Sequence, residues 1–179
     1  EIKDILSYLR ILINPNDEEA FKRIINYPAR GIGATTIDKL TIAANHYKKS
    51  IFEIIKYIDK IDININSATK NKLQNFMNMM LRLQIESQTK NAFEIAEVVV
   101  KQTQLIKDLE KDGTPESVSK VENVQELLNG IKDFITDKIE QGEDASLTTF
   151  LEDVALATDF DAKKDEDKPS VSLMTIHQS

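Results

Sequence analysis

The sequence predicts an all-α, multi-helix domain, with a candidate for one short β-strand at its C-terminus. Apolar residues recur at helical spacing over three long stretches, residues 2–13, 67–88 and 117–139. Most of the five glycines and four prolines lie between such stretches, where these residue types end helices. Only the run VSLMTI, residues 171–176, has the composition of a buried strand.

Four helices are expected in the N-terminal third of the chain. The first ends before Pro15, because proline disfavours helical backbone in the residue that precedes it. Asn16 is predicted to cap the second, whose first turn carries three carboxylates that the helix dipole favours. Ser50 is predicted to cap the fourth. The expected ranges are 2–13, about 17–26, 35 or 36 to 49, and 51–58.

Four more helices are expected in the remainder of the chain. Three isoleucines alternate within residues 59–66 as in a strand, but no partner strand is near, so this segment is predicted to be a loop. The fourth of these helices, capped by Ser146, has an expected inner face that includes Leu156. Residues 158–170 are typical of a solvated, charged linker. The expected helical ranges are 67–88, 93–102, 117–139 and 147–157.

The composition excludes several classes of site. Without cysteine the chain has no disulfide, thiolate nucleophile or thiolate zinc site, which agrees with a cytoplasmic location. The two histidines, His46 and His177, are far apart in sequence, so no metal site is expected. No apolar run approaches the roughly 20 residues that span a bilayer, and no signal-peptide pattern opens the chain, so no membrane contact is expected.

Charge is distributed unevenly along the chain. Residues 1–60 contain ten Lys and Arg against eight Asp and Glu, a net +2, whereas residues 61–179 contain thirteen against twenty-two, a net −9. An anion-binding face is therefore expected in the first third.

The segment NYPARGIGATTIDKL, residues 26–40, is the one place where two glycines lie one residue apart. Gly31 and Gly33 allow positive φ and close approach to a ligand. Unpaired amides at the start of the next helix form an anion site, to which Thr35 and Thr36 add hydroxyl donors and Arg30 adds charge. The spacing lacks the long loop and the Lys-Ser/Thr of a P-loop, but it suits one phosphate of a nucleic-acid backbone.

The alternative for this segment is a plain corner between two helices, whose glycines only permit close packing. The remaining groups give weaker signals. The acidic runs lack the spacing of a calcium loop, and the methionines of residues 75–84 are expected to fill a core. His177 follows the candidate strand, where either a structural or a functional role is open. No combination of residues indicates a catalytic centre, so no catalytic residue is predicted.

Four stretches, taken together, resemble the UvrD/Rep/PcrA group of superfamily 1 DNA helicases. Residues 1–26 resemble the segment that follows motif IV, and YPARGIGATTIDKL resembles the family's Pro-x-Arg-Gly-Ile-Gly-x-x-Thr stretch. SKVENVQELLNGIKDF is similar to an Arg/Lys-x-Glu-Asn helix, and the C-terminal run ending in VSLMTIHQS is similar to the entry into motif V. The resemblance covers nearly the whole chain in order, and it suggests a piece of a longer protein.

The resemblance implies a domain organisation and a set of DNA contacts. Residues 1–14 would be a flanking helix leading from subdomain 2A, 15–168 the helical subdomain 2B, and 169–179 a return strand into subdomain 2A. The two ends would then lie close in space. In the family the glycine segment belongs to a helix-hairpin-helix-like element on the duplex, and motif V contacts single-stranded DNA. The implied contacts are Arg30, Gly31, Ile32, Gly33, Ala34, Thr35 and Thr36 for the duplex, and Thr175 and His177 for the single strand.

The implied function is that of a duplex-contacting, regulatory subdomain of an ATP-dependent 3′–5′ DNA helicase of repair or replication. ATP and Mg²⁺ would bind elsewhere in the parent protein, because this chain has no Walker A or acidic Mg²⁺ motif; no cofactor and no ATP turnover are expected here. The other helicase subdomains and repair or transcription proteins are further expected partners. The alternatives are a helical module that recruits such proteins without useful DNA binding, and a regulatory domain of an unrelated all-α enzyme.

Overall fold

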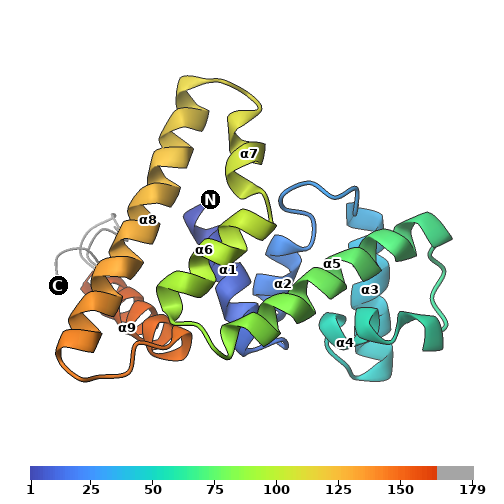
Figure 1. The fold of residues 1–179 in the computed structure, drawn as a ribbon. Coiled ribbons are helices and arrows are strands. Elements are labelled where there is room, and N and C mark those ends of the chain that lie inside the picture. The colour runs from blue at the N-terminus through green and yellow to red at the C-terminus, as the bar shows by residue number, and fades with distance from the viewer. Residues whose placement is uncertain (165–179) are drawn as a thin grey trace.

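A computed structural model of the chain describes residues 1–164, which form nine α-helices and one short 3-10 helix (Figure 1). The all-α prediction is confirmed for this part of the chain, whereas the candidate strand lies outside the described residues. None of the helices in residues 1–164 is long and apolar enough to cross a membrane. The elements are α1 (Ile2–Ile13), α2 (Glu18–Ile24), α3 (Ala34–Tyr47), α4 (Ile51–Lys56), η1 (Ile58–Lys60), α5 (Ser67–Ser87), α6 (Ala92–Gln102), α7 (Leu105–Glu110), α8 (Pro115–Glu140) and α9 (Leu147–Lys164).

Local side chains determine where most of these helices begin. Six N-cap side chains accept a hydrogen bond from a backbone N–H of the first turn, which satisfies a donor that has no partner within the helix. At α6 the contact is reciprocal, because Glu94 also accepts from the N-cap backbone. The six N-cap residues are Asp17, Ser50, Asn66, Asn91, Thr114 and Ser146. Ser146 accepts from Thr149 N at 3.3 Å, so its predicted role as the cap of α9 is confirmed.

Several helix starts differ from the prediction. α6 and α8 begin one and two residues early, at Ala92 and Pro115. The side chain that caps α2 is Asp17 and not Asn16; its carboxylate accepts from Ala20 N at 3.1 Å. The Asn16 amide instead donates to the side chain of Asn14. α3 begins at Ala34, one or two residues before the predicted start at Thr35 or Thr36, so that Gly33 is its N-cap.

Two elements of the C-terminal half also differ from the prediction. The short helix α7 was not expected, and its N-cap Gln104 has a left-handed backbone, φ +56°, with no side-chain cap. α9 continues to Lys164, through the first part of the predicted charged linker. Leu156 is 68% exposed and not on the inner face. Val154 and Phe150 are buried, and Leu156 lies on the opposite side of the helix from Val154, because two residues turn it by about 200°.

Helix α1 is central to the core, with eight of its twelve residues buried. It packs against α2, α5, α6, α8 and α9. Figure 1 shows α1 in the middle of the molecule. The Asp4 carboxylate accepts from Arg23 Nε at 2.7 Å, which fixes α2 against α1. The helix predicted as a flank is therefore an integral part of the packed domain. The proposed division at residues 14 and 168 remains a prediction.

The glycine segment lies over an aromatic cluster. Phe21 of α2 contacts Phe52 of α4 and Phe76 of α5 edge to face, with ring centroids 6.0 and 5.7 Å apart. α3 and α4 stand at one end of the molecule beside the N-terminal half of α5, whereas α8 and α9 stand at the other end (Figure 1). The connection from α2 to α3 therefore runs along the surface between two well-packed elements.

Candidate nucleic-acid interface

The glycine corner, residues 26–36, connects the end of α2 to the first turn of α3. Gly31 has φ +73°, a conformation that glycine adopts without the penalty imposed by a Cβ. Gly33 has φ −83°, which any residue adopts, and a Cβ placed on it would meet no atom within 4 Å. The two glycines therefore serve different purposes: Gly31 is required by the backbone turn, whereas Gly33 keeps the start of α3 open.

The first turn of α3 is accessible and has no internal cap. The N-cap Gly33 offers no side-chain acceptor, and the first turn contains no acidic residue. Gly33, Ala34 and Thr35 are exposed, and Thr36 is half-buried. The Gly33 carbonyl already accepts from Ile37 N at 3.1 Å, so the regular helix begins at once behind these amides. An N-terminus of this kind, on a helix of 14 residues, attracts an anion.

Asn26 shapes the corner from the end of α2. Its side-chain oxygen accepts from the backbone N–H groups of Arg30, at 2.8 Å, and Ile32, at 3.1 Å. The amides of Arg30 and Ile32 are thus satisfied internally, while those at the start of α3 are not capped by any side chain. This role of Asn26 was not predicted from the sequence. The known preference of asparagine for bonds to nearby backbone could have suggested it.

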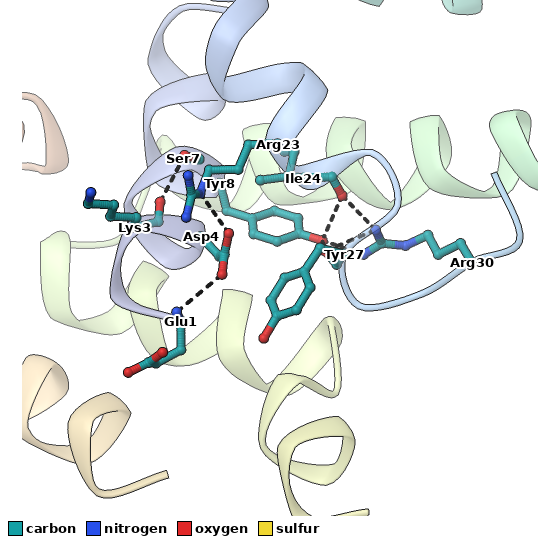
Figure 2. A network of polar contacts seen from close by, with 9 residues as sticks. All are labelled: Glu1, Lys3, Asp4, Ser7, Tyr8, Arg23, Ile24, Tyr27 and Arg30. Carbon is teal, nitrogen blue, oxygen red and sulfur yellow. Dashed lines mark hydrogen bonds and ion pairs between the residues drawn. The ribbon is translucent and has the colours of Figure 1, made fainter. Parts of the chain in front are cut away.

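Arg30 is directed into the protein. Its Nη1 donates to the carbonyl of Ile24 at 2.8 Å and to that of Tyr27 at 3.2 Å. Its Nη2 donates to the Tyr8 hydroxyl, and Figure 2 shows these partners gathered around the guanidinium. Its Cζ lies 4.8 Å from the centre of the Phe76 ring, a cation–π distance. The guanidinium is therefore engaged by the end of α2, by α1 and by α5.

Tyr8 links this arrangement to the central helix. Its hydroxyl donates to the Tyr27 carbonyl at 2.5 Å while it accepts from Arg30 (Figure 2). Burial raises the pKa of Tyr8 to about 12, although the adjacent Arg30 guanidinium opposes the shift. The phenol is therefore neutral at physiological pH, and it can serve as donor and acceptor at once.

Lys72 of α5 lies across Gly31, although it is 41 residues away in sequence. A Cβ on Gly31 would be 2.7 Å from Lys72 Nζ and 3.4 Å from its Cε, so the lysine occupies the space that a side chain would fill. Lys72 is exposed, and no carboxylate of residues 1–164 forms an ion pair with it. No sequence pattern links Lys72 to the corner, because only the fold brings them together.

The residues predicted as duplex contacts fall into two groups. Gly31, Gly33, Ala34, Thr35 and Thr36 lie together on the accessible side of the corner. Arg30 is half-buried with its head group inward, and Ile32 is 0% exposed, so the Ile32 side chain serves the core. The predicted single-strand contacts Thr175 and His177 lie outside the described residues, as does the chain end Ser179.

Two open depressions lie on this part of the molecule, one beside the corner and one farther along α3. One, of about 160 Å³, lies between residues 28–30 and α7, where Lys107 and Lys111 reach its wall. The other, of about 240 Å³, lies on α3 and is lined by Ile42, Tyr47 and Ile63 among others. Ile42 is 68% exposed, so the outer face of α3 carries apolar surface. Within residues 1–164 no group of three or more His, Asp and Glu is arranged to hold a metal ion.

Comparison with known proteins gives one consistent result. The family described as the UvrD-like helicase C-terminal domain matches residues 1–179. The ATP-dependent DNA helicase PcrA of Bacillus subtilis (strain 168) is 35% identical over 182 residues, which cover 99% of this chain and 24% of that protein. Proteins of the same name from Leuconostoc citreum and Staphylococcus aureus (strain Mu50 / ATCC 700699) are each 34% identical, and in both cases the match covers 24% of the relative. The chain thus spans about a quarter of the length of these curated relatives.

Proposed function

The chain belongs to the UvrD-like helicase C-terminal domain family, and from this we propose that it is the part of an ATP-dependent DNA helicase that holds the duplex. The observation that carries the proposal is the open first turn of α3, where an N-cap without a side chain leaves accessible amides. Relatives named as DNA helicases make a DNA phosphate the appropriate anion for this position. The corner acts as a binding element, and the chemistry of unwinding belongs to the parent protein.

The mechanism follows from the geometry of the corner. The amides of the first turn and the positive end of the helix dipole hold one phosphate oxygen, and the Thr35 and Thr36 hydroxyls add donors. Backbone phosphates are the same for every base sequence, so the contact positions the duplex without reading it. A few such contacts give weak binding, with a Kd of roughly 10⁻⁴–10⁻⁶ M at physiological salt and a strong salt dependence.

In the parent enzyme this chain would act as the helical subdomain 2B between two connections to subdomain 2A. ATP and Mg²⁺ would bind in the RecA-like domains, and translocation would run 3′ to 5′. Thr175 and His177, in the segment that enters motif V, would contact the single strand. Rotation of the helical domain about its two connections would open or close the grip on the duplex.

Substitutions of Gly33 test the proposal without damage to the fold. At φ −83°, with no atom within 4 Å of a new Cβ, aspartate and asparagine fit this position. Both are favourable N-caps, so Gly33→Asp and Gly33→Asn should match or slightly exceed the stability of the parent chain. Asparagine competes for the amides, whereas aspartate competes and also repels phosphate. We therefore expect duplex affinity to fall severalfold for Gly33→Asn and at least about tenfold for Gly33→Asp.

The measurement is a titration of a fluorescently labelled blunt duplex with the 179-residue chain at low salt, alongside urea unfolding of each variant. Stability that is retained while affinity falls in the order Gly, Asn, Asp supports the proposal. If the Gly33→Asp chain binds the duplex as tightly as the parent chain does, the start of α3 does not hold a phosphate and the proposal is rejected.

The second candidate function is a protein-interaction module, and the exposed apolar surface of α3 favours it. Ile42 and Tyr47 line the depression on the outer side of α3, away from its first turn. An Ile42→Glu variant separates the two functions. Under the duplex proposal it leaves the affinity for the blunt duplex unchanged within about twofold, because it lies more than two turns from Gly33. A repair or transcription protein that binds the parent chain, loses affinity for Ile42→Glu and keeps it for Gly33→Asp would establish the module.

A further inference from the structure

The corner contains one arginine, but its guanidinium is already used inside the protein. Arg30 Nη1 donates to the carbonyls of Ile24 and Tyr27, and Nη2 donates to the Tyr8 hydroxyl. The Arg30 Cζ also lies 4.8 Å from the centre of the Phe76 ring. To contact a phosphate outside, Arg30 would have to give up all of these hydrogen bonds and its contact with the Phe76 ring.

Lys72 is the cation that lies against Gly31 on the accessible side of the corner. Its Nζ and Cε lie 2.7 and 3.4 Å from the position of a Cβ on Gly31, so the whole end of the side chain rests on the glycine. Gly31 is two residues before the N-cap of α3, a backbone distance of roughly 7 Å or less. Within residues 1–164 no acidic side chain pairs with Lys72. An ammonium group and the uncapped amides of α3 therefore face the same region.

We propose that Lys72, and not Arg30, is the side-chain cation that contacts the duplex phosphate at the glycine corner, and that Arg30 is a positioning residue. This inference rests on the proposed duplex-binding function. Lys72 approaches because Gly31 has no side chain, and Arg30 holds the carbonyls behind the corner so that the first turn of α3 keeps its orientation. The corner thus has two cations: Lys72 of α5 on its accessible side, and its own Arg30, which faces the protein interior.

The two roles differ in how duplex affinity depends on salt. Each phosphate contact made by a Lys or Arg releases counterions and contributes about 0.9 to the slope of log K against log salt. Loss of a direct contact lowers that slope by about one and weakens binding to all sequences alike. Loss of a positioning residue lowers affinity through the geometry of the site but leaves the slope unchanged.

The experiment titrates a labelled blunt duplex of about 20 base pairs with the 179-residue chain, from about 50 to about 200 mM salt. The variants are Lys72→Gln, Arg30→Gln and Tyr8→Phe, with Lys90→Gln as the matched control. Lys90 follows the far end of α5, more than about 20 Å from Lys72, and the Lys90→Gln substitution removes the same charge as Lys72→Gln. Tyr8→Phe removes a partner of Arg30 without a change in charge, so it tests positioning even if Arg30→Gln does not fold.

We expect Lys72→Gln to weaken binding about three- to tenfold at the lowest salt and to lower the slope of log K against log salt by about 0.9. Between about 50 and about 200 mM salt, the variant should therefore lose about 3.5-fold less affinity than the parent chain. Tyr8→Phe and folded Arg30→Gln should weaken binding with the slope of the parent chain. Equal behaviour of Lys72→Gln and Lys90→Gln overturns the assignment of Lys72, and a slope lowered by Arg30→Gln overturns its positioning role. If the parent chain itself fails to bind the duplex, the proposed function falls, whereas binding that survives Lys72→Gln unchanged rejects only this inference.

Discussion

Removal of the Asn26 side chain should loosen the glycine corner by a predictable amount. Its oxygen accepts from Arg30 N at 2.8 Å and from Ile32 N at 3.1 Å. Each hydrogen bond of this kind contributes about 1 kcal/mol to stability, so Asn26→Ala should lower the free energy of unfolding by about 2 kcal/mol. For a chain of this size that corresponds to a decrease in Tm of about 4–8 °C.

Asn26→Asp keeps the acceptor oxygen and replaces only the amide nitrogen of the side chain. A carboxylate accepts from both amides, so stability should stay within about 0.5 kcal/mol of the parent chain. The added negative charge beside the corner should nevertheless weaken duplex binding. The two substitutions therefore have opposite profiles: alanine lowers stability, whereas aspartate lowers affinity at constant stability.

The assay is urea unfolding followed by far-UV circular dichroism, with Asn78→Ala as the control. Asn78 is exposed on α5, where an alanine should change stability by no more than about 0.5 kcal/mol. If Asn26→Ala were as stable as Asn78→Ala, the two hydrogen bonds would not hold the corner. If Asn26→Asp were as unstable as Asn26→Ala, the acceptor would not be the cause.

Three further predictions test the frame around the corner. The pKa of Tyr8 is raised from about 10 to about 12, so its contribution to stability is complete below pH 10 and is lost as pH rises to 12. Between these values the free energy of unfolding of the parent chain, measured with urea, should fall by up to about 1.4 kcal/mol per pH unit more steeply than that of Tyr8→Phe. Equal slopes for the two chains would contradict this. Asn91→Ala removes the reciprocal cap of α6 and should cost about 1 kcal/mol in the same assay, whereas no change would mean that packing alone fixes this helix start. Phe21→Ala, at a side chain that is 0% exposed among Phe52 and Phe76, should cost about 3–5 kcal/mol, and a loss below 1 kcal/mol would contradict the packed cluster.

The division between Arg30 and Lys72 changes how variants of this corner should be interpreted. Loss of duplex binding on substitution of Arg30 is expected from its internal partners alone, and so it does not identify a contact. Two effects oppose a side chain at Gly31, and they differ in energetic cost. The positive φ strains any other residue by about 1 kcal/mol, whereas the 2.7 Å approach to Lys72 Nζ is relieved cheaply, because the end of a lysine moves freely.

The helical ranges were largely predictable because helix formation depends on local sequence. The periodic apolar residues of α1, α5 and α8 gave their ranges to within about two residues, and Ser50 caps α4 as predicted. The failures were also local in cause. α7 is six residues long and starts at a left-handed Gln104, for which no cap or proline gives a signal, and the charged residues after 157 extend a solvent-facing helix instead of ending it.

The sequence by itself determined the all-α class, the family and the place of the glycine corner, because helical periodicity and short motifs are properties of neighbouring residues. It could not determine which way Arg30 points, since a guanidinium beside glycines can face a ligand or the protein. Only the packing of α1 and α5 against the end of α2 gives Arg30 its internal partners, Tyr8 and Phe76, and places Lys72 on Gly31. These contacts join residues 22 to 46 positions apart in sequence, and such pairs become neighbours only when the core forms.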